Sequence, residues 1–343
     1  MALANSLRDR LFEWLQITDE PVVKVYHGFG HGDQMVVMGH VLKISPLPPR
    51  KRRPTLWTNT LNLLRLFFVR PYPFADVTLN WEGRTIRSHT EKDGFFRLEW
   101  NPAQSPKPGW HEVEVQLPGR SKGSQQVAIT GRGHVYVPHR NQYACVSDID
   151  DTFLISHSSN LRKRMFVLLT EDAHSRDPFD DVVEHYQLLA RAGTHHLEPN
   201  PFFYVSSSEW NLYDYILTFS KRNDMPEGVY LLNQLKRFRE ILKTGQNKHL
   251  TKFNRIARIL HAFPELKFIL LGDDTQEDPN IYTSIINHFP SQIICVYLRQ
   301  VNARNRERTL AYIAKIKEAG VECCYFKHSS EAIEHTKRIG LAV

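Results

Sequence analysis

The stretch YACVSDIDDTFLISH, residues 143–157, joins a short apolar run to a group of acidic residues. Residues 143–146 have the character of a buried strand, and Asp148, Asp150 and Asp151 follow almost at once. Strands of a buried parallel sheet end together at one edge, so such a run would carry its carboxylates to a single place. The acidic group could form a turn, a metal site or a nucleophile, and the flanking sequence has to distinguish them.

Downstream of this stretch, apolar runs alternate with helical patterns. The runs are FFYVSSS (202–208), GVYLLNQL (228–235), KFILLGDD (267–274), QIICVYLRQV (292–301) and ECCYFK (322–327). Their apolar character is continuous rather than alternating, which is typical of strands buried on both faces of a parallel sheet. We therefore predict an α/β, Rossmann-like domain over residues 139–343, with ligands bound at the carboxyl ends of its strands.

The first 138 residues have a different character. Short runs rich in Val, Ile, Phe and Trp are separated by turn residues, and Val113 and Val115 alternate with Glu112 and Glu114. Asp93-Gly94 between two such runs predicts a hairpin. This pattern favours a small β-sandwich domain over residues 1–138.

Residues 46–73 interrupt the β-pattern with a basic, proline-rich stretch followed by an apolar helical run. Such a segment can lie on an anionic membrane surface. The alternative is a long loop whose helix packs on the protein, and charge runs most often simply face water.

The net charge of +7 favours anionic partners such as phosphates or lipid headgroups. The strands lack interleaved aromatic and basic residues, so no nucleic acid partner is expected. Four cysteines without metal-ligand spacing indicate a reducing compartment. Neither a signal peptide nor a transmembrane segment is visible. We expect a cytoplasmic protein, with peripheral membrane contact left open.

Polar residues follow the apolar runs at the predicted strand ends, and one lysine lies in the helical pattern before the 267–274 run. They are Asp148, Asp150, Thr152, Ser206, Ser207, Lys252, Asp273 and Asp278. A carboxylate can attack phosphorus to form an aspartyl-phosphate, and a second carboxylate can move the protons. Carboxylates also bind Mg²⁺, while a hydroxyl and an ammonium can hold phosphoryl oxygens. The set therefore predicts phosphoryl-transfer chemistry.

The order of these residues resembles the haloacid-dehalogenase superfamily, whose motifs are DxDx[TV], a strand ending in Ser or Thr, a Lys, and GDxxxxD. SDIDDT (147–152), FFYVSSSEWNLYDY (202–215) and GDDTQEDPNIY (272–282) resemble more closely the catalytic domain of the actin-patch-associated phosphatidate phosphatase family. The resemblance covers residues 140–330 approximately. It implies a haloacid-dehalogenase-like fold and, as the reaction, hydrolysis of phosphatidate to diacylglycerol and phosphate at an anionic membrane surface.

The resemblance also implies a role for each residue. Asp148 would be the nucleophile, and Asp150 the general acid and base. The groups that would hold the phosphate are Thr152, Ser206, Ser207 and Lys252. The cofactor would be Mg²⁺, with Asp148, Asp150, Asp273 and Asp278 as its ligands. The family often has His-Lys at the motif lysine, where this chain has Thr251-Lys252 with Lys248 just upstream; counting back from Asp273 favours Lys252.

Several alternatives accompany these assignments. Asp151 is interpreted as a cap, Asp274 as either a supporting residue or a solvated one, and Ser207 and Ser208 as N-caps of the next helix. For the whole chain, one alternative is a phosphatase of soluble or protein phosphomonoesters. The other is a non-catalytic scaffold, which the complete set of polar groups disfavours.

Overall fold

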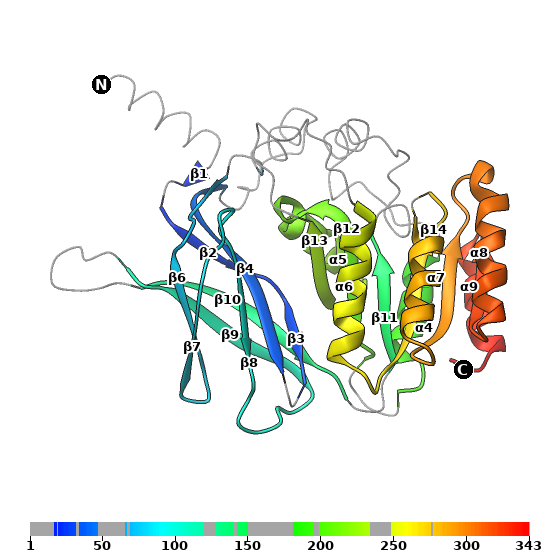
Figure 1. Cartoon of the computed structure of the whole chain (residues 1–343), viewed down its shortest axis with the longest axis horizontal. Helices are drawn as coiled ribbons and strands as arrows, with labels where there is room; N and C mark the ends of the chain where they lie inside the picture. Colours follow the sequence, from blue (N-terminus) through cyan, green and yellow to red (C-terminus); the bar gives the residue numbers. More distant parts are fainter. Residues whose placement is uncertain are drawn as a thin grey trace, which may run out of the picture. The chain divides into compact units, whose positions relative to one another are not determined.

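The apolar runs of the sequence form two separate sheets in the computed structural model (Figure 1). The structure describes residues 17–18, 20–31, 34–46, 66, 69–119, 128–139, 143–149, 181–194, 199–233, 248–275 and 277–342. Described residues up to Val137 form one unit, and those from Pro138 onward form the other. Most of the interruption at 46–73 lies outside the described residues.

The first unit is built from strands that pair in one mixed network. They are β1 (Ile17–Thr18), β2 (Val22–Val25), β3 (Gly28–Gly30), β4 (Met35–Pro46), β5 (Arg70–Pro71), β6 (Asp76–Trp81), β7 (Arg84–His89), β8 (Phe95–Trp100), β9 (Gly109–Leu117) and β10 (Ile129–Val137). The long strand β4 pairs with β2 and β3 along one edge and with β5 and β8 along the other. β3 pairs with β10 in parallel. The sandwich arrangement stays a prediction.

Alternation along β9 confirms the period-2 pattern of the sequence. Val113 and Val115 are buried in the core of this unit, whereas Glu112 is exposed. The hairpin predicted at Asp93-Gly94 is wrong, because β7 pairs with β6 and β8 pairs with β4. The two-residue hairpin turn lies instead at Glu82-Gly83, whose φ values of +49° and +79° suit the twist of the strands β6 and β7 that it joins.

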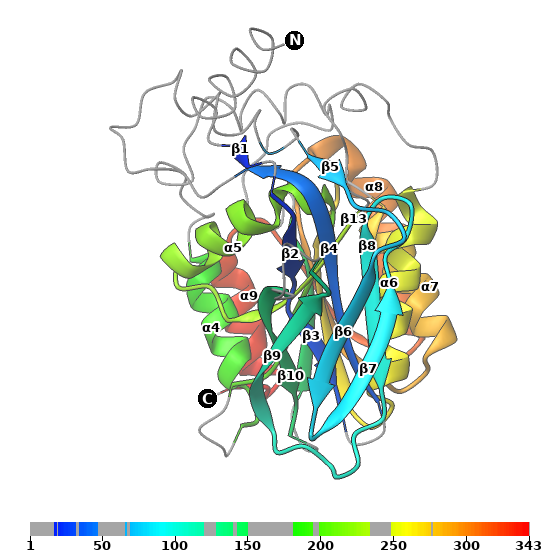
Figure 2. The same cartoon turned by 90° about the vertical axis from the view of Figure 1, so that its left-hand side faces the viewer.

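The second unit is a parallel sheet covered by helices on both faces, which confirms the predicted α/β character. Its strands are β11 (Tyr143–Asp148), β12 (Phe202–Glu209), β13 (Gly228–Asn233), β14 (Lys267–Asp273), β15 (Ile293–Arg299) and β16 (Glu322–Phe326). Its helices are α4 (Val182–Arg191), α5 (Tyr213–Arg222), α6 (Lys248–Ala262), α7 (Asp278–His288), α8 (Arg306–Glu318) and α9 (Ser329–Arg338). α4, α5 and α9 lie on one face, and α6, α7 and α8 on the other (Figure 2). No helix among the described residues is long and apolar enough to cross a bilayer.

The strand order β13-β12-β11-β14-β15-β16 determines where a ligand can bind. The chain builds outward from β11 in one direction through β12 and β13, and then in the other through β14 to β16. Doubly wound sheets bind ligands outside the carboxyl ends of the strands at this point of reversal. Asp148 ends β11 and Asp273 ends β14, so both residues lie there.

Candidate active site

Asp148 is held at the end of β11 by neighbours on both sides. β11 lies between β12 and β14, and Asp148 is fully buried. The Ser147 hydroxyl donates a hydrogen bond to the main-chain oxygen of Asp148 at 2.7 Å, and it accepts one from the Tyr186 hydroxyl of α4, also at 2.7 Å. The main chain at Asp148 is therefore fixed from the α4 face of the sheet.

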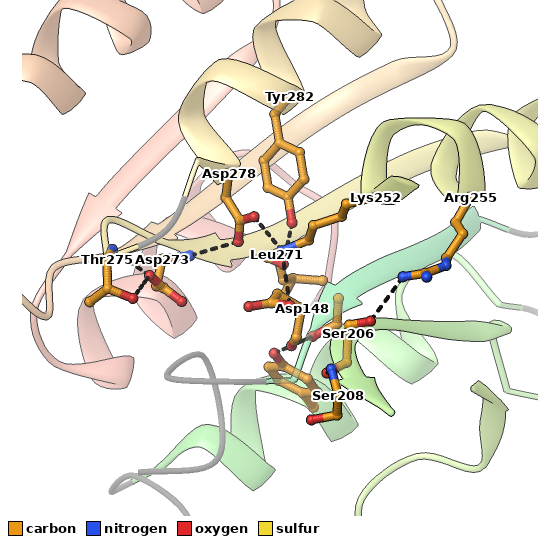
Figure 3. Close-up of polar contacts among 12 residues, drawn as sticks. Asp148, Ser206, Ser208, Lys252, Arg255, Leu271, Asp273, Thr275, Asp278 and Tyr282 are labelled. Atoms are coloured by element: carbon orange, nitrogen blue, oxygen red, sulfur yellow. Dashed lines mark hydrogen bonds and ion pairs between the residues drawn. The ribbon is translucent and has the colours of Figure 1, made fainter. Parts of the chain in front are cut away.

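Lys252 joins two carboxylates that come from different elements. Its Nζ lies 2.9 Å from Asp148 Oδ1 and also contacts Asp278 Oδ1, and the side chain is almost completely buried (Figure 3). Burial by itself opposes the charged form, but the Asp148 and Asp278 carboxylates outweigh it and raise the pKa of Lys252 above its ordinary value. Lys252 is therefore an ammonium group. The side chain of Lys248, the other candidate, lies outside the described residues.

Asp278 begins α7 and folds back over the end of β14. Its Oδ2 accepts a long hydrogen bond of 3.4 Å from the main-chain N–H of Asp273. A Cβ at Gly272 would lie 2.5 Å from Asp278 Oδ2 and 2.9 Å from the Tyr282 ring, so the glycine of the GDxxxxD pattern makes room for both. The Tyr282 hydroxyl donates to the main-chain oxygen of Leu271 at 2.7 Å, which anchors α7 to the strand.

Asp273 completes a group of three buried acids. Burial, and next the charge of Asp278, raises the pKa of Asp273 to about 7, although hydrogen bonds from Thr275 and the charge of Lys252 partly oppose the shift. The Thr275 hydroxyl donates to Asp273 Oδ1 at 2.6 Å. Asp148, Asp273 and Asp278 each offer an oxygen within 4.8 Å of the others.

These four residues, Asp148, Lys252, Asp273 and Asp278, are called here the carboxylate cluster. It sets three carboxyl groups against one ammonium in a buried place, where unbalanced charge is costly. Oxygen ligands in this number, with surplus negative charge, fit Mg²⁺, which takes a few carboxylates and completes its shell with substrate and water. The donor set therefore fits the predicted cofactor.

The predicted phosphate ligands on β12 differ in their exposure. Ser206 is buried, and its hydroxyl accepts a hydrogen bond from the main-chain N–H of Ser208 at 2.9 Å; Ser207 is half-buried. The interpretation of Ser207 and Ser208 as N-caps is wrong, because both lie within β12 and the N-cap of α5 is Leu212.

Arg255 connects the ends of two strands to the helix that carries Lys252. Its guanidinium donates to the main-chain oxygen of Ser206 at 3.0 Å (Figure 3). It also donates to Asn233 Oδ1 at 3.2 Å. Burial, and then the nearby charge of Arg258, lowers the pKa of Arg255 to about 10. Arg255 was not predicted from the sequence, although its position three residues after Lys252 places both on one side of α6.

Asp274 points away from the carboxylate cluster and is neither solvated nor exposed. Its Oδ1 accepts hydrogen bonds from the main-chain N–H groups of Val301 and Asn302, each at 2.9 Å, and its Oδ2 accepts one from the Tyr325 hydroxyl at 2.7 Å. It therefore ties the end of β14 to the loop after β15. Asp150, Asp151 and Thr152 lie outside the described residues.

Comparison with known proteins concerns mainly the second unit. Residues 143–300 match the family described as "Phosphatidate phosphatase APP1, catalytic domain". Over 155 residues the chain is 32% identical to phosphatidate phosphatase APP1 of Saccharomyces cerevisiae, which covers 45% of this chain and 25% of that protein. Over 215 residues it is 22% identical to an uncharacterized protein of Schizosaccharomyces pombe, covering 62% of this chain and 34% of that protein. The chain thus spans between a quarter and about a third of the length of these relatives.

Solved structures add little to this comparison. A carbohydrate acetylesterase from Xanthomonas citri aligns with 89% of this chain and 68% of its own, at a TM-score of 0.29 and 10% identity. A TM-score this low carries no argument about fold or function.

Proposed function

Since residues 143–300 match the family of phosphatidate phosphatase APP1 catalytic domains, we propose that this chain is a Mg²⁺-dependent phosphatase that hydrolyses phosphatidate through an aspartyl-phosphate. We also propose that its parallel-sheet unit has the haloacid-dehalogenase-like fold. One observation carries the proposal: the buried Lys252 ammonium contacts both Asp148 and Asp278 where the strand order reverses. Nucleophile, cation and metal ligands then share one small volume.

In the first half of the reaction, a carboxylate oxygen of Asp148 attacks phosphorus. The bond between phosphorus and the ester oxygen breaks, and the leaving diacylglycerol oxygen takes a proton from Asp150. In the second half, Asp150 takes a proton from water, and the water oxygen attacks phosphorus and releases Asp148 and inorganic phosphate. Lys252 neutralises negative charge on Asp148, so that an anionic phosphate can approach it.

Asp148, Asp273 and Asp278, together with Asp150, would hold Mg²⁺. When bound, the ion supplies positive charge that stabilises the phosphoryl oxygens. The surplus of buried carboxyl groups supports this assignment, as does the raised pKa of Asp273, which a nearby cation would lower again.

Ser206, Ser207 and Thr152 would hold the phosphoryl oxygens. The two hydrogen bonds of Arg255 keep the β12 end beside α6, so that Ser206 and Lys252 lie near the same phosphate. Phosphatidate is proposed as substrate from the named relative and from the basic net charge. The protein would be cytoplasmic and would meet its substrate at a membrane surface.

The experiment is phosphate release from phosphatidate in mixed micelles, with Mg²⁺ or with EDTA. We expect phosphate release with Mg²⁺ but not with EDTA. In Asp148→Asn the rate of release should fall at least ~1000-fold, because the nucleophile is removed. Asp224→Asn is the matched control, since Asp224 is exposed and its φ of +51° suits asparagine.

Release from small soluble phosphoesters but not from phosphatidate would keep the chemistry and refute the lipid substrate. Folded protein that released phosphate from neither substrate with Mg²⁺ present would refute the enzyme and favour the scaffold.

A further inference from the structure

The loop that follows β15 leaves the sheet beside the carboxylate cluster. β14 and β15 are parallel neighbours, and Asp273 pairs with Arg299 at their carboxyl ends. Residues 300–305 and the first turn of α8 therefore lie at the same edge of the sheet as Asp148 and Asp273 (Figure 1).

This segment presents unpaired positive charge. Arg304 and Arg306 are exposed, and neither has a carboxylate partner among the residues that the structure describes. Arg308 is different, because it forms an ion pair with Glu277 at 3.0 Å. Glu307 is the one acidic residue between positions 301 and 310, so the segment is basic overall.

The same segment also exposes apolar side chains. In the described part of the chain, the exposed large hydrophobic residues are Phe74, Val301 and Leu310, at 73%, 37% and 42% exposure. Two of these three therefore belong to this segment. Leu310 follows Arg306 by four residues in α8, so their side chains lie on one side of the helix.

The loop is held in a fixed shape from inside the protein. The Asp274 carboxylate binds the N–H groups of Val301 and Asn302, and the Asn305 side chain donates to the Asp274 main-chain oxygen at 2.6 Å. The Asn302 side chain also accepts from the Arg304 N–H at 3.1 Å. The exposed side chains are thus presented by a rigid support, which lowers the entropy cost of binding.

The arginines do not help the helix that they precede. Positive charge is unfavourable at a helix N-terminus, where the unsatisfied N–H groups already carry partial positive charge. Arg304 and Arg306 lie just before and at the first residue of α8, so the fold would gain from neutral or acidic residues there. Their placement points to an external partner.

We propose that Val301, Arg304, Arg306 and Leu310, called here the α8 patch, bind an anionic phospholipid surface. Arginines matched to anionic headgroups, with apolar side chains between them, are what such a surface recognises. Docking there would bring the carboxyl edge of the sheet to the membrane, where a lipid phosphate is found. This inference rests on the proposed lipid substrate, and it adds the surface that delivers the site to it.

The test is sedimentation of the full chain with vesicles of phosphatidylcholine alone, or of equimolar phosphatidylcholine and phosphatidylserine. Binding is expected to the anionic vesicles, to weaken with added salt, and to fall about fivefold for each patch arginine removed. Arg304→Gln/Arg306→Gln should therefore bind about 25-fold more weakly. Val301→Ser should weaken it further.

Lys315→Gln/Lys317→Gln is the matched control. Both lysines are exposed and lie in the last turn of the same helix, at the opposite edge of the sheet, and the change in net charge is identical. The control should bind as the parent does. Thermal unfolding should show that the patch variant is no less stable, since it removes positive charge from a helix N-terminus.

Hydrolysis of a soluble phosphomonoester separates this inference from the proposed function. A patch variant with parental activity on the soluble ester but weak vesicle binding would support the α8 patch. Three results would overturn the patch: a parent chain that ignores anionic vesicles, a patch variant that binds them normally, or a control that loses binding equally. Soluble-ester activity in the parent would leave the phosphatase chemistry standing in each case, and its absence would refute the chemistry separately.

Discussion

Two buried polar clusters in the second unit differ in charge, since one holds ionisable acids and a lysine and the other is neutral. The first is the carboxylate cluster at the carboxyl edge of the sheet. The second, called here the α4–α9 cluster, joins α4, β15 and α9 and comprises His185, Tyr297, His335 and Thr336. Both are shielded from water, so their differences reflect chemistry rather than exposure.

The α4–α9 cluster is neutral, and its side chains are hydrogen-bonded to one another. Thr336 donates its hydroxyl proton to the main-chain oxygen of Ala332 at 2.7 Å, so it accepts from the Tyr297 hydroxyl at 2.7 Å and from His185 Nε2–H at 3.2 Å. Burial, followed by the charge of Arg299, lowers the pKa of His185 to about 3. Such a network rigidifies the sheet without unbalanced charge.

The carboxylate cluster has no such balance within the described residues. Its acids repel one another, and Lys252, together with the charge of the buried Arg299 that acts on Asp273, compensates them only in part. A fold selected for stability alone would gain by replacing such a group with apolar residues. A satisfied polar network of this kind stabilises the structure, whereas the surplus charge of the carboxylate cluster is what the proposed Mg²⁺ would balance.

The largest expected effect follows from removing the cation of the carboxylate cluster. Lys252→Met keeps an unbranched side chain that is one atom shorter and leaves the acids without their ammonium. We expect activity to fall at least ~1000-fold, and stability to fall by about 3–5 kcal/mol where the metal is absent, as for other broken buried ion pairs. Urea unfolding with EDTA measures the stability, and phosphate release measures the activity. Unchanged stability would mean that the acids become protonated without cost.

Mg²⁺ should stabilise the folded protein through the carboxylate cluster and not through the α4–α9 cluster. At about 100 times its dissociation constant, a ligand that binds only the folded protein stabilises it by about 2.7 kcal/mol. We expect Mg²⁺ to raise the unfolding temperature of the parent, and to do so much less in Asp273→Asn.

Thr336→Val, which alters only the α4–α9 cluster, is the matched variant and should respond to Mg²⁺ as the parent does. An equal response to Mg²⁺ in Asp273→Asn would place the metal elsewhere.

The smallest effect is the pH dependence of the α4–α9 cluster. His185 has a pKa near 3 when folded and about 6.5 when unfolded, so the unfolded chain binds more protons as the pH falls below the unfolded value. The contribution of His185 to the free energy of unfolding is therefore fully present above about pH 6.5 and is lost towards pH 3. Between about pH 7 and about pH 5.5 the loss should be about 1 kcal/mol.

His185→Gln removes this titration while keeping an N–H donor, so its stability should depend less steeply on pH than that of the parent. The comparison must be made as a difference, because burial and the charge of Lys24 lower the pKa of His40 in the first unit to about 3 as well. Identical slopes for parent and variant would show that His185 has the same pKa in the folded and unfolded states.

Sequence patterns predicted the parallel sheet and the gathering of Asp148, Lys252, Asp273 and Asp278. Continuous apolar runs are a local signal, and the strand-end rule then places distant residues at one edge without knowledge of contacts. The prediction of a hairpin at Asp93-Gly94 was wrong because a local turn signal does not determine which strands pair. The local turn is present, with Gly94 at φ +80°, but β7 pairs with the strand before it, β6, and β8 pairs with the distant strand β4.

Supporting residues were the least predictable part of the site. Nothing in the sequence distinguishes Tyr186 from an ordinary core aromatic, because its role depends on Ser147 across the gap between α4 and β11. Asp274 had two open interpretations, since its partners Val301, Asn302 and Tyr325 follow far along the chain. Polar contacts of this kind carry no periodicity, and only the folded structure reveals them.

The pairing of β11 with β14 also sets the moment at which the carboxylate cluster can form during synthesis. Synthesis delivers β11, β12 and β13 first, and the edge of β11 next to Asp148 stays open until Lys252 and then β14 have left the ribosome. An open edge of this kind invites pairing with other chains. The step that closes it also brings Asp273 and Asp278 to Asp148, so assembly of the carboxylate cluster and protection from aggregation occur together.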